Sequence, residues 1–418
     1  MSAFSLRHGE WYAEDVPLAR VAMAHGTPCY VYSRAALTGA YQSFDAAFAT
    51  HAHQVCYAVK ANPNLAILNV FARLGSGFDI VSGGELARVL AAGGDPNKVV
   101  FSGVGKTADE IRAALKAEIQ CFNIESAAEL ARINDIAGAM GKIAPVSLRV
   151  NPDVDAKTHP YIATGLKETK FGVPFDDALT LYKQAAASKH LNVEGIDCHI
   201  GSQLIEVAPF SAAVERVLSL VREINAAGIT LKHIDLGGGL GIQYQAEARP
   251  ASVNEYAAAI LGALKGRTEK LLFEPGRYLV GNAGLLLTRV EYLKPGKLNG
   301  DLNFAIVDAA MNDLMRPALY DAWHDIHTVH ENEGALQSWE IVGPVCESGD
   351  FLGRARRLAL KEGDLVAIRS AGAYGMSMSS NYNTRTRAAE VMIDGATMHV
   401  ARERERIEQL FAHEFVLK

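Results

Sequence analysis

The chain has few cysteines, and their number and spacing argue against two kinds of structural site. The count of five is odd, and no two cysteines form a CxxC pair. Both observations argue against a disulfide framework and against a zinc site of paired cysteines. Three of the cysteines lie in apolar, strand-like runs, where a free thiol behaves as a small hydrophobic side chain. The five are Cys29, Cys56, Cys121, Cys198 and Cys346.

Long apolar runs and an excess of basic charge are also missing. No run approaches the roughly 20 apolar residues that span a bilayer, and the first ten residues lack the apolar stretch of a signal peptide. We therefore expect a cytoplasmic protein without a membrane partner. The 41 basic and 47 acidic residues give a net charge of −6. This balance argues against nucleic acid as a partner, but it leaves room for a local basic pocket that binds a small anion.

Eight short apolar runs alternate with alanine- and leucine-rich stretches of helical spacing between residues 34 and 280. The runs are 55–61, 77–83, 99–103, 121–126, 146–152, 194–202, 233–239 and 271–277. Near-continuous apolar strands, each followed by a helix, are typical of a parallel sheet covered on both faces. Eight such units in about 250 residues predict a TIM-like (β/α)8 barrel. A doubly wound open sheet is the alternative, and periodicity alone does not exclude it.

The pattern changes near residue 281, where strand-like runs follow one another with little helix between them. Residues 285–292, 303–308, 339–342 and 365–369 are such runs, and turn signals separate them. They predict a C-terminal all-β domain, a barrel or sandwich, over 281–418. Residues 1–33 contain one strand candidate, Cys29–Ser33, which either joins the β domain or leads into the barrel.

Lys60 stands at the end of the first apolar run of the barrel, in the segment YAVKAN at 57–62. A lysine is almost never fully buried without a partner. Lys60 is therefore either a surface residue at the mouth of the strand or a chemical group. Burial disfavours the ammonium form, and a neutral amine is what a Schiff base needs.

Glycines follow the last two barrel strands. The run Gly237–Gly241 ends the seventh strand, and Gly276-Arg277 ends the eighth. Glycines let backbone N–H groups approach an anion, and barrels often bind phosphate in these two loops. A tight turn is the simpler explanation of either motif alone, but the two together favour a phosphate site.

Three further polar residues belong to the barrel strands: Asp79 lies inside the second strand, His199 at the end of the sixth and Glu274 at the end of the eighth. Each alone could be an ordinary rim residue or ion-pair partner. Together with Lys60 and the glycines they match one cofactor, pyridoxal 5′-phosphate. This cofactor needs an amine for its aldehyde, a nest for its phosphate, an acid for its ring nitrogen and a flat group against its ring.

The second domain adds groups that could act on a substrate. Cys346 lies in GPVCESGD at 343–350, and a thiol with a reference pKa of about 8.5 can donate a proton near neutral pH. Arg316 and Tyr320 could bind a carboxylate. His324, His327 and His330 recur every three residues, but a helical metal motif needs histidines four apart, so we expect no metal there.

Taken in order, the motifs of the chain resemble the fold-type III pyridoxal-phosphate decarboxylases nearly end to end. HPYIATG and the ESGD and RPALY segments favour the diaminopimelate branch of that family. The motifs are YAVKAN (57–62), HPYIATG (159–165), KFG (170–172), HIGSQ (199–203), DLGGGLG (235–241), EPGR (274–277), RPALY (316–320), GPVCESGD (343–350) and AGAYG (371–375).

The resemblance implies a role for each matching residue. Lys60 bonds to the cofactor aldehyde, His199 stacks on the ring, and Glu274 pairs with the ring nitrogen. The family forms homodimers in which two chains share each active site. Cys346 then comes from the partner subunit and protonates the carbanion. The other implied cofactor residues are Asp79, Ser202, Gly238, Gly239, Gly276, Arg277 and Tyr374. The implied substrate residues are Arg277, Arg316, Tyr320, Glu347 and Tyr374.

By the same resemblance, the reaction is decarboxylation of meso-2,6-diaminopimelate to L-lysine and carbon dioxide, the final step of lysine biosynthesis, and residues 1–33 join the β domain. Three alternatives remain open. A decarboxylase of another basic amino acid is disfavoured by the presence of both Glu347 and Arg316. Two opposite charges suit an amino-acid group at the far end of the substrate, whereas a plain amine needs only acids. An alanine racemase is disfavoured by Glu274, because a protonated ring is a strong electron sink. A non-catalytic homologue would lack the lysine, the thiol or the β domain, and all three are present.

Overall fold

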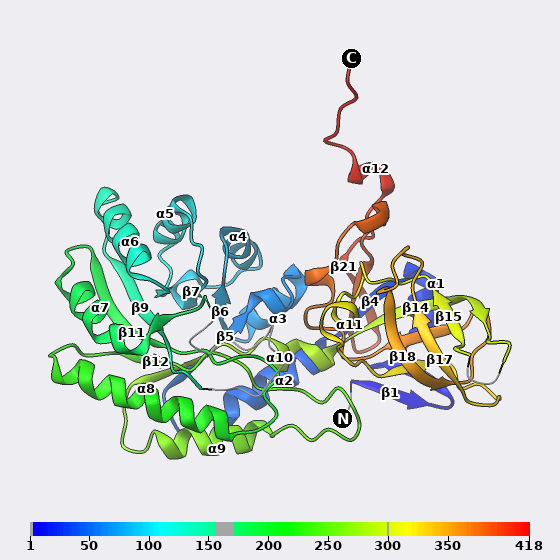
Figure 1. The fold of residues 1–418 in the computed structure, drawn as a ribbon, viewed down its shortest axis with the longest axis horizontal. Helices are drawn as coiled ribbons and strands as arrows, with labels where there is room; N and C mark the ends of the chain where they lie inside the picture. Colours follow the sequence, from blue (N-terminus) through cyan, green and yellow to red (C-terminus); the bar gives the residue numbers. More distant parts are fainter. Residues whose placement is uncertain (1–2, 155–169, 299–300) are drawn as a thin grey trace. The chain divides into compact units, whose positions relative to one another are not determined.

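The chain forms two compact units, which are described one at a time. The computed structural model describes residues 3–154, 170–298 and 301–418. The barrel unit comprises Ala40–Ile242 and Arg249–Leu279. The sheet unit comprises Met1–Gly39, Gln243–Ala248 and Val280–Lys418 (Figure 1). Among the described residues, no helix is long and apolar enough to cross a membrane.

Eight parallel strands close into a ring in the barrel unit. They are β5 (His53–Ala58), β6 (Gly77–Ile80), β7 (Val99–Phe101), β8 (Cys121–Ile124), β9 (Ala144–Asn151), β11 (Leu191–Asp197), β12 (His233–Asp235) and β13 (Lys270–Phe273). Sequence neighbours pair in parallel, and the pairing of β13 with β5 closes the ring. The short β10 (Val173–Pro174) adds to β9 outside the ring. The predicted barrel is confirmed, and the open sheet is excluded.

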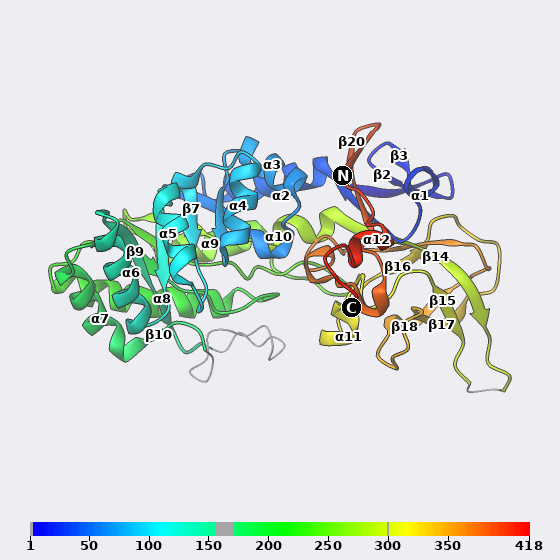
Figure 2. The same cartoon turned by 90° about the horizontal axis from the view of Figure 1, so that it is seen from above.

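Helices follow the strands and cover the outside of the ring (Figures 1 and 2). They are α3 (Leu65–Arg73), α4 (Gly83–Ala91), α5 (Ala108–Ala117), α6 (Ala127–Ala139), α7 (Phe175–Ala187), α8 (Ala208–Ala226), α9 (Val253–Ala263) and the short α10 (Arg277–Val280). Side-chain caps fix where several begin. Thr107 and Ser252 each form a reciprocal capping box with the glutamate three residues later. Each helix then turns one apolar stripe toward the strands, as α5 does with Ile111, Ala114 and Leu115.

The core of the ring explains the scattered cysteines. Cys56 and Cys121 pack with Val100 and Leu272 in one fully buried cluster inside the barrel. Burial raises the pKa of both thiols well above the ordinary range, so they stay neutral and serve as small apolar side chains. Cys29 and Cys198 are also buried, whereas Cys346 is exposed.

The sheet unit is built on a nine-stranded sheet whose main path runs β18–β17–β15–β14–β4–β20–β21. Its strands are β4 (Cys29–Ser33), β14 (Gly284–Lys294), β15 (Phe304–Val307), β16 (Ile326–Thr328), β17 (Gln337–Val342), β18 (Phe351–Leu358), β19 (Leu365–Ile368), β20 (Ala389–Asp394) and β21 (Thr397–Arg402). The N-terminal strand β4 lies in the middle, antiparallel to β14 and parallel to β20. The three segments 1–33, 34–280 and 281–418 stay a prediction as functional domains.

The remaining N-terminal elements belong to the same unit. Strands β1 (Phe4–Arg7), β2 (Glu10–Ala13) and β3 (Val16–Pro17) form a separate small sheet, followed by α1 (Leu18–His25). Phe4 and Val16 are buried in one cluster with Val31, Leu285 and Val391. The first residues of the chain therefore help to form the core of the sheet unit. The short α12 (Ile407–Leu410) lies in the charged C-terminal tail.

Candidate active site at the carboxyl ends of the barrel strands

Lys60 lies just past the end of β5, in the one-turn 3₁₀ helix Val59–Ala61. Its Nζ donates a hydrogen bond of 2.9 Å to Oδ2 of Asp79, which is in β6. The Lys60 side chain is 37% exposed, while the Asp79 side chain is fully buried. The prediction that Lys60 ends the strand is wrong by two residues, because the ladder with β6 stops at Ala58 and the chain then turns. The turn leaves the amine accessible yet within reach of an acid.

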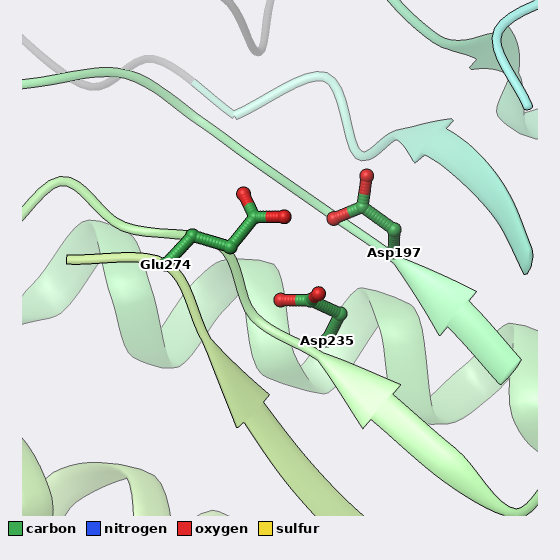
Figure 3. Close-up of side chains that lie close together, drawn as sticks. All are labelled: Asp197, Asp235 and Glu274. Carbon is green, nitrogen blue, oxygen red and sulfur yellow. The ribbon is translucent and has the colours of Figure 1, made fainter. Parts of the chain in front are cut away.

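Three buried carboxyl groups converge just past the ends of neighbouring strands (Figure 3). Asp197 ends β11, Asp235 ends β12, and Glu274 follows β13. One oxygen atom of each lies within 4.8 Å of the other two, and all three side chains are buried. Asn123 and Ser102 each donate to Oε1 of Glu274 at 3.4 Å. Sequence reasoning found Glu274 but missed both aspartates, although each is an acid at the end of an apolar run.

Burial and mutual repulsion keep these acids from ionising together. Burial raises the pKa of Glu274 well above its ordinary range, and the charges of Asp235, Asp79 and Asp197 raise it further. Burial likewise raises the pKa of Asp235 to about 7, although the Gly237 N–H donates to its Oδ1 at 2.9 Å. The cluster therefore holds at least one proton near neutral pH unless a cation enters it.

Replacing Asp235 by asparagine is expected to stabilise the cofactor-free protein at high pH. The pKa of Asp235 rises from 3.8 to about 7 on folding, so wild-type stability falls as pH rises through this window. Asparagine cannot ionise and can still accept from Gly237. At pH 8 we expect Asp235→Asn to be more stable by on the order of 4 kcal/mol, and at pH 4 most of the gain should vanish.

Denaturant unfolding at the two pH values measures this difference. Asp135→Asn on the exposed face of α6 is the matched control and should show no such dependence. An equal effect of Asp235→Asn at both pH values would contradict the assignment of a proton to the buried acids.

His199 presents a neutral ring beside these acids. The Gly238 N–H donates to its Nδ1 at 3.1 Å, so the ring proton of the neutral form is on Nε2. Burial lowers the pKa of His199 well below its ordinary value, and the nearby cations Arg149 and Lys60 lower it further. An uncharged, flat imidazole is suited to stacking on an aromatic ring, and the stacking role of His199 stays a prediction.

The first three residues of the glycine run after β12 lie too close to neighbouring atoms to carry a side chain. Gly237 has φ of +64°, and a Cβ there would lie 2.5 Å from Nδ1 of His199. A Cβ on Gly238 would lie 2.3 Å from the carbonyl oxygen of Glu274. Gly239, with φ of +114°, would clash with the Gly201 carbonyl at 2.7 Å. The run therefore brings its backbone against the loops that follow β11 and β13.

Ser202 and Arg277 meet where those loops converge. The guanidinium of Arg277 donates to Oγ of Ser202 from Nε at 3.3 Å and from Nη2 at 3.1 Å. Gly276 approaches the turn of Lys60, since a Cβ on it would lie 3.0 Å from Cβ of Ala61. A hydroxyl, a guanidinium and glycine backbone thus gather at one place, which is a donor set suited to phosphate.

An ion pair that is buried on both sides borders the site and was not predicted. Arg149 in β9 donates to Oε1 of Glu125 at 2.9 Å, and both side chains are almost fully buried. Glu125 also accepts from the Gly172 N–H at 2.7 Å, within the KFG motif. An arginine inside an apolar strand run was the available signal. The HPYIATG motif at 159–165 lies outside the described residues.

The predicted residues of the sheet unit are described separately. Arg316 is buried at the start of the short helix α11 (Arg316–Tyr320), and Tyr320 is half-buried at its end. Cys346 and Glu347 are exposed, and Glu347 accepts a 2.5 Å hydrogen bond from the hydroxyl of Tyr382. Tyr374 is half-buried, with φ of +56°. Positive φ is uncommon outside glycine and often marks a functional turn.

The barrel residues fit pyridoxal phosphate on chemical grounds. One buried oxygen of each of Asp79, Asp197 and Asp235 has no hydrogen-bond partner among the described residues. Such an excess of buried acceptors around Glu274 suits a protonated ring nitrogen. Lys60 offers the amine, His199 the flat ring, and Ser202 with Arg277 the phosphate donors. The fold and the site thus define a barrel enzyme of the pyridoxal-dependent class.

Comparison with known proteins agrees with this class. The family model for "Pyridoxal-dependent decarboxylase, pyridoxal binding domain" matches residues 34–281. The chain is 58% identical to diaminopimelate decarboxylase of Pseudomonas aeruginosa over 417 residues, which is 100% of both chains. The chain belongs to the pyridoxal-dependent decarboxylases, and within them to the diaminopimelate decarboxylase family. The predicted family and cofactor are confirmed.

Solved structures show the same likeness. The crystal structure of diaminopimelate decarboxylase from Helicobacter pylori complexed with L-lysine is 42% identical with a TM-score of 0.91, covering 95% of this chain and 99% of that one. Its counterpart from M. jannaschii in co-complex with L-lysine is 37% identical with a TM-score of 0.95, covering 100% and 99%. The likeness therefore extends over both units.

Proposed function

We propose that this chain decarboxylates meso-2,6-diaminopimelate to L-lysine and carbon dioxide, the last step of lysine biosynthesis. The observation that carries the proposal is the accessible amine of Lys60, 2.9 Å from a buried acid at the mouth of the barrel. It occurs in a chain that matches a diaminopimelate decarboxylase over its full length. The expected setting is the cytoplasm.

The barrel residues hold the cofactor. Bound pyridoxal phosphate supplies an aldehyde for an amine and a ring that withdraws electrons from the substrate α-carbon. Lys60 would bond to its aldehyde, and Asp79 orients the lysine Nζ. His199 would cover its ring, and Glu274 would pair with its ring nitrogen. The phosphate and outer contacts fall to Ser202, Gly238, Gly239, Gly276, Arg277 and Tyr374.

The acidic neighbours of Glu274 contribute to its proposed pairing with the ring nitrogen. An isolated exposed glutamate would simply be ionised at neutral pH, whereas burial among Asp197 and Asp235 makes the cluster retain a proton. The ring nitrogen of the cofactor is basic, and in this buried cluster it could share that proton. The nearby negative charges would favour the protonated form of a ring nitrogen bound there, and a protonated ring would withdraw electrons from the substrate more strongly.

Cys346 delivers the proton that replaces carbon dioxide. Loss of the α-carboxylate as carbon dioxide leaves an electron pair on the α-carbon, and one proton must arrive there. Cys346 is an exposed free thiol, so it can give a proton and regain one from water. The bond that forms is carbon to hydrogen, and the thiolate is the conjugate base.

The charges of the sheet unit match the far end of the substrate. Diaminopimelate carries a second amino-acid group there, with one carboxylate and one ammonium. Arg316 suits the carboxylate, with Tyr320 and Tyr374 of the same unit as further donors, and Glu347 suits the ammonium. Arg277 of the barrel unit is the remaining donor proposed for the substrate. A plain terminal amine, as in ornithine, would need only an acid.

A homodimer with shared active sites completes the proposal. In this arrangement the barrel of one protomer binds the cofactor, and the sheet unit of its partner contributes Cys346. The exposure of Cys346 supports this, because a proton donor must be open to a substrate held elsewhere.

A four-substrate assay tests the substrate assignment. The holoenzyme should release carbon dioxide from meso-2,6-diaminopimelate and form L-lysine. Ornithine, arginine and carboxynorspermidine lack the charge-matched far end, and we expect kcat/KM for each to be lower by roughly 10⁴-fold. Turnover of any of these three in preference to diaminopimelate would reject the assignment. Racemisation of alanine would instead support the racemase alternative. Complete inactivity would support the non-catalytic alternative.

A further inference from the structure

His324 is the first of the three evenly spaced histidines, and it is completely buried. The other two have different partners. Nε2 of His327 lies 2.8 Å from Oδ2 of Asp325, and His330 lies 3.8 Å from Glu10. Only His324 contacts a residue assigned to the substrate. Its Nε2 lies 2.8 Å from Nη1 of Arg316.

The fold fixes the position of this imidazole. His324 lies two residues before β16, and Arg369 lies directly after β19, which pairs antiparallel with β16. The pairing places Nδ1 of His324 2.8 Å from the carbonyl oxygen of Arg369. The carbonyl oxygen of His324 in turn accepts from Nη2 of Arg356 at 3.1 Å. Both the ring and the backbone of His324 are therefore anchored.

The two ring contacts determine the tautomer. A carbonyl oxygen only accepts hydrogen bonds, so Nδ1 must be the protonated nitrogen that donates to Arg369. A guanidinium only donates, so Nε2 must accept from Arg316 through its lone pair. The geometry requires a neutral imidazole with its single proton on Nδ1. The backbone thus prepares an acceptor aimed at the arginine.

Tyr244 supports the same guanidinium from another side. Cζ of Arg316 lies 4.7 Å from the centroid of the Tyr244 ring, a cation–π distance. The Tyr244 and His324 rings are 5.4 Å apart and nearly perpendicular, at 82°. Tyr244 belongs to Gln243–Ala248, the short segment that joins the sheet unit from within the barrel sequence. A ring face and a ring nitrogen therefore restrict Arg316 together.

We propose that His324 is a positioning residue that, with Tyr244, orients Arg316 to recognise the carboxylate at the far end of the substrate. The inference rests on the proposed function, in which Arg316 binds that carboxylate. A long arginine side chain loses rotamer freedom when it is ordered. His324 and Tyr244 order it before the substrate arrives, so the cost of ordering does not weaken binding.

The test separates the carboxylate from the rest of the ligand. L-lysine retains the far amino-acid group after decarboxylation, and 1,5-diaminopentane is the same molecule without the carboxylate. Both are titrated into the holoenzyme and followed by the absorption of the cofactor. His324→Leu should weaken L-lysine binding and raise KM for diaminopimelate by roughly ten- to a hundredfold, the effect of losing a hydrogen bond to a charged group. Its affinity for 1,5-diaminopentane and its kcat should stay near those of wild type.

Three further variants make the result specific. His324→Gln keeps a donor and an acceptor and should restore most of the L-lysine affinity. Tyr244→Ala should weaken L-lysine binding, whereas Tyr244→Phe, which keeps the ring face, should not. His330→Gln is the matched histidine control and should behave as wild type. If His324→Leu does not fold, the glutamine variant and the Tyr244 pair still test the proposal.

Arg316→Met distinguishes the two levels of the argument. If it leaves L-lysine binding unchanged, the role of Arg316 fails, and this inference fails with it. If Arg316→Met weakens L-lysine binding but His324→Leu and Tyr244→Ala do not, only the inference is overturned. Equal losses for L-lysine and 1,5-diaminopentane in His324→Leu would also overturn it, because they indicate general damage to the unit.

Discussion

Lys60→Ala is expected to reduce turnover by roughly 10⁴- to 10⁶-fold, as removal of a covalent catalyst does. The variant cannot bond covalently to the cofactor aldehyde, so the corresponding visible absorption should disappear even when the cofactor still binds. Absorption spectra and steady-state rates measure the two effects. Borohydride reduction of the wild-type protein should attach the cofactor permanently to Lys60, which peptide mass analysis can locate.

Lys106 provides a matched comparison, since it is also a lysine beyond a barrel strand. Its Nζ donates to the carbonyl oxygens of Gly103 and Asn123 and to Glu129, at 2.7–2.9 Å, and its side chain is fully buried. All three N–H groups are thus occupied within the protein, whereas Lys60 is partly exposed. Lys106→Met should cost stability but leave the cofactor bond intact. A covalent bond that survives in Lys60→Ala would remove Lys60 from its role.

Cys346→Ala should lower kcat by about 10²- to 10⁴-fold, the usual contribution of a positioned general acid. The cofactor absorption should stay unchanged, because Lys60 and the barrel residues are intact. KM should change little, since the thiol meets the substrate only after carbon dioxide has left. Cys346→Ser keeps the shape but is a far weaker acid, so it should resemble the alanine variant. Wild-type turnover in either variant would dismiss the thiol as proton donor.

Mixed dimers test whether Cys346 acts across two chains. Lys60→Ala and Cys346→Ala are each nearly inactive, but a hybrid dimer with shared sites contains one site with both wild-type residues. After unfolding and refolding of equal amounts, half of the dimers are hybrids, so about a quarter of wild-type activity should return. Sites formed within single chains would give no recovery.

Much of the barrel site could be predicted from the sequence because the geometry of parallel barrel strands is regular. Side chains at the carboxyl ends of consecutive barrel strands come together whatever the detailed geometry is. Lys60, Asp79, His199 and Glu274 each lie within or just after an apolar run, so their convergence followed from the order of the runs. The error at Lys60 was local, because hydrophobicity continues into Val59 while the strand hydrogen bonds end at Ala58.

The partners of these residues could not be predicted in the same way. Asp197 and Asp235 look like ordinary strand residues, and their importance comes from lying within 4.8 Å of Glu274. Their retained proton depends on burial, which is a property of the folded barrel and not of the motif. The contact of His324 with Arg316 depends on the pairing of β16 with β19, and histidine spacing gave no sign of it.

The sequence by itself predicted the barrel and determined the family, the cofactor and the residues proposed to act on it, because these depend on strand order and on motifs of fixed residue type. Only the tertiary structure decided how the charges are balanced. It buried the acids around Glu274, fixed the neutral forms of His199 and His324, and left the amine of Lys60 beside Asp79. Protonation depends on the dielectric environment and on neighbours distant in sequence, and both come into being only when the chain folds.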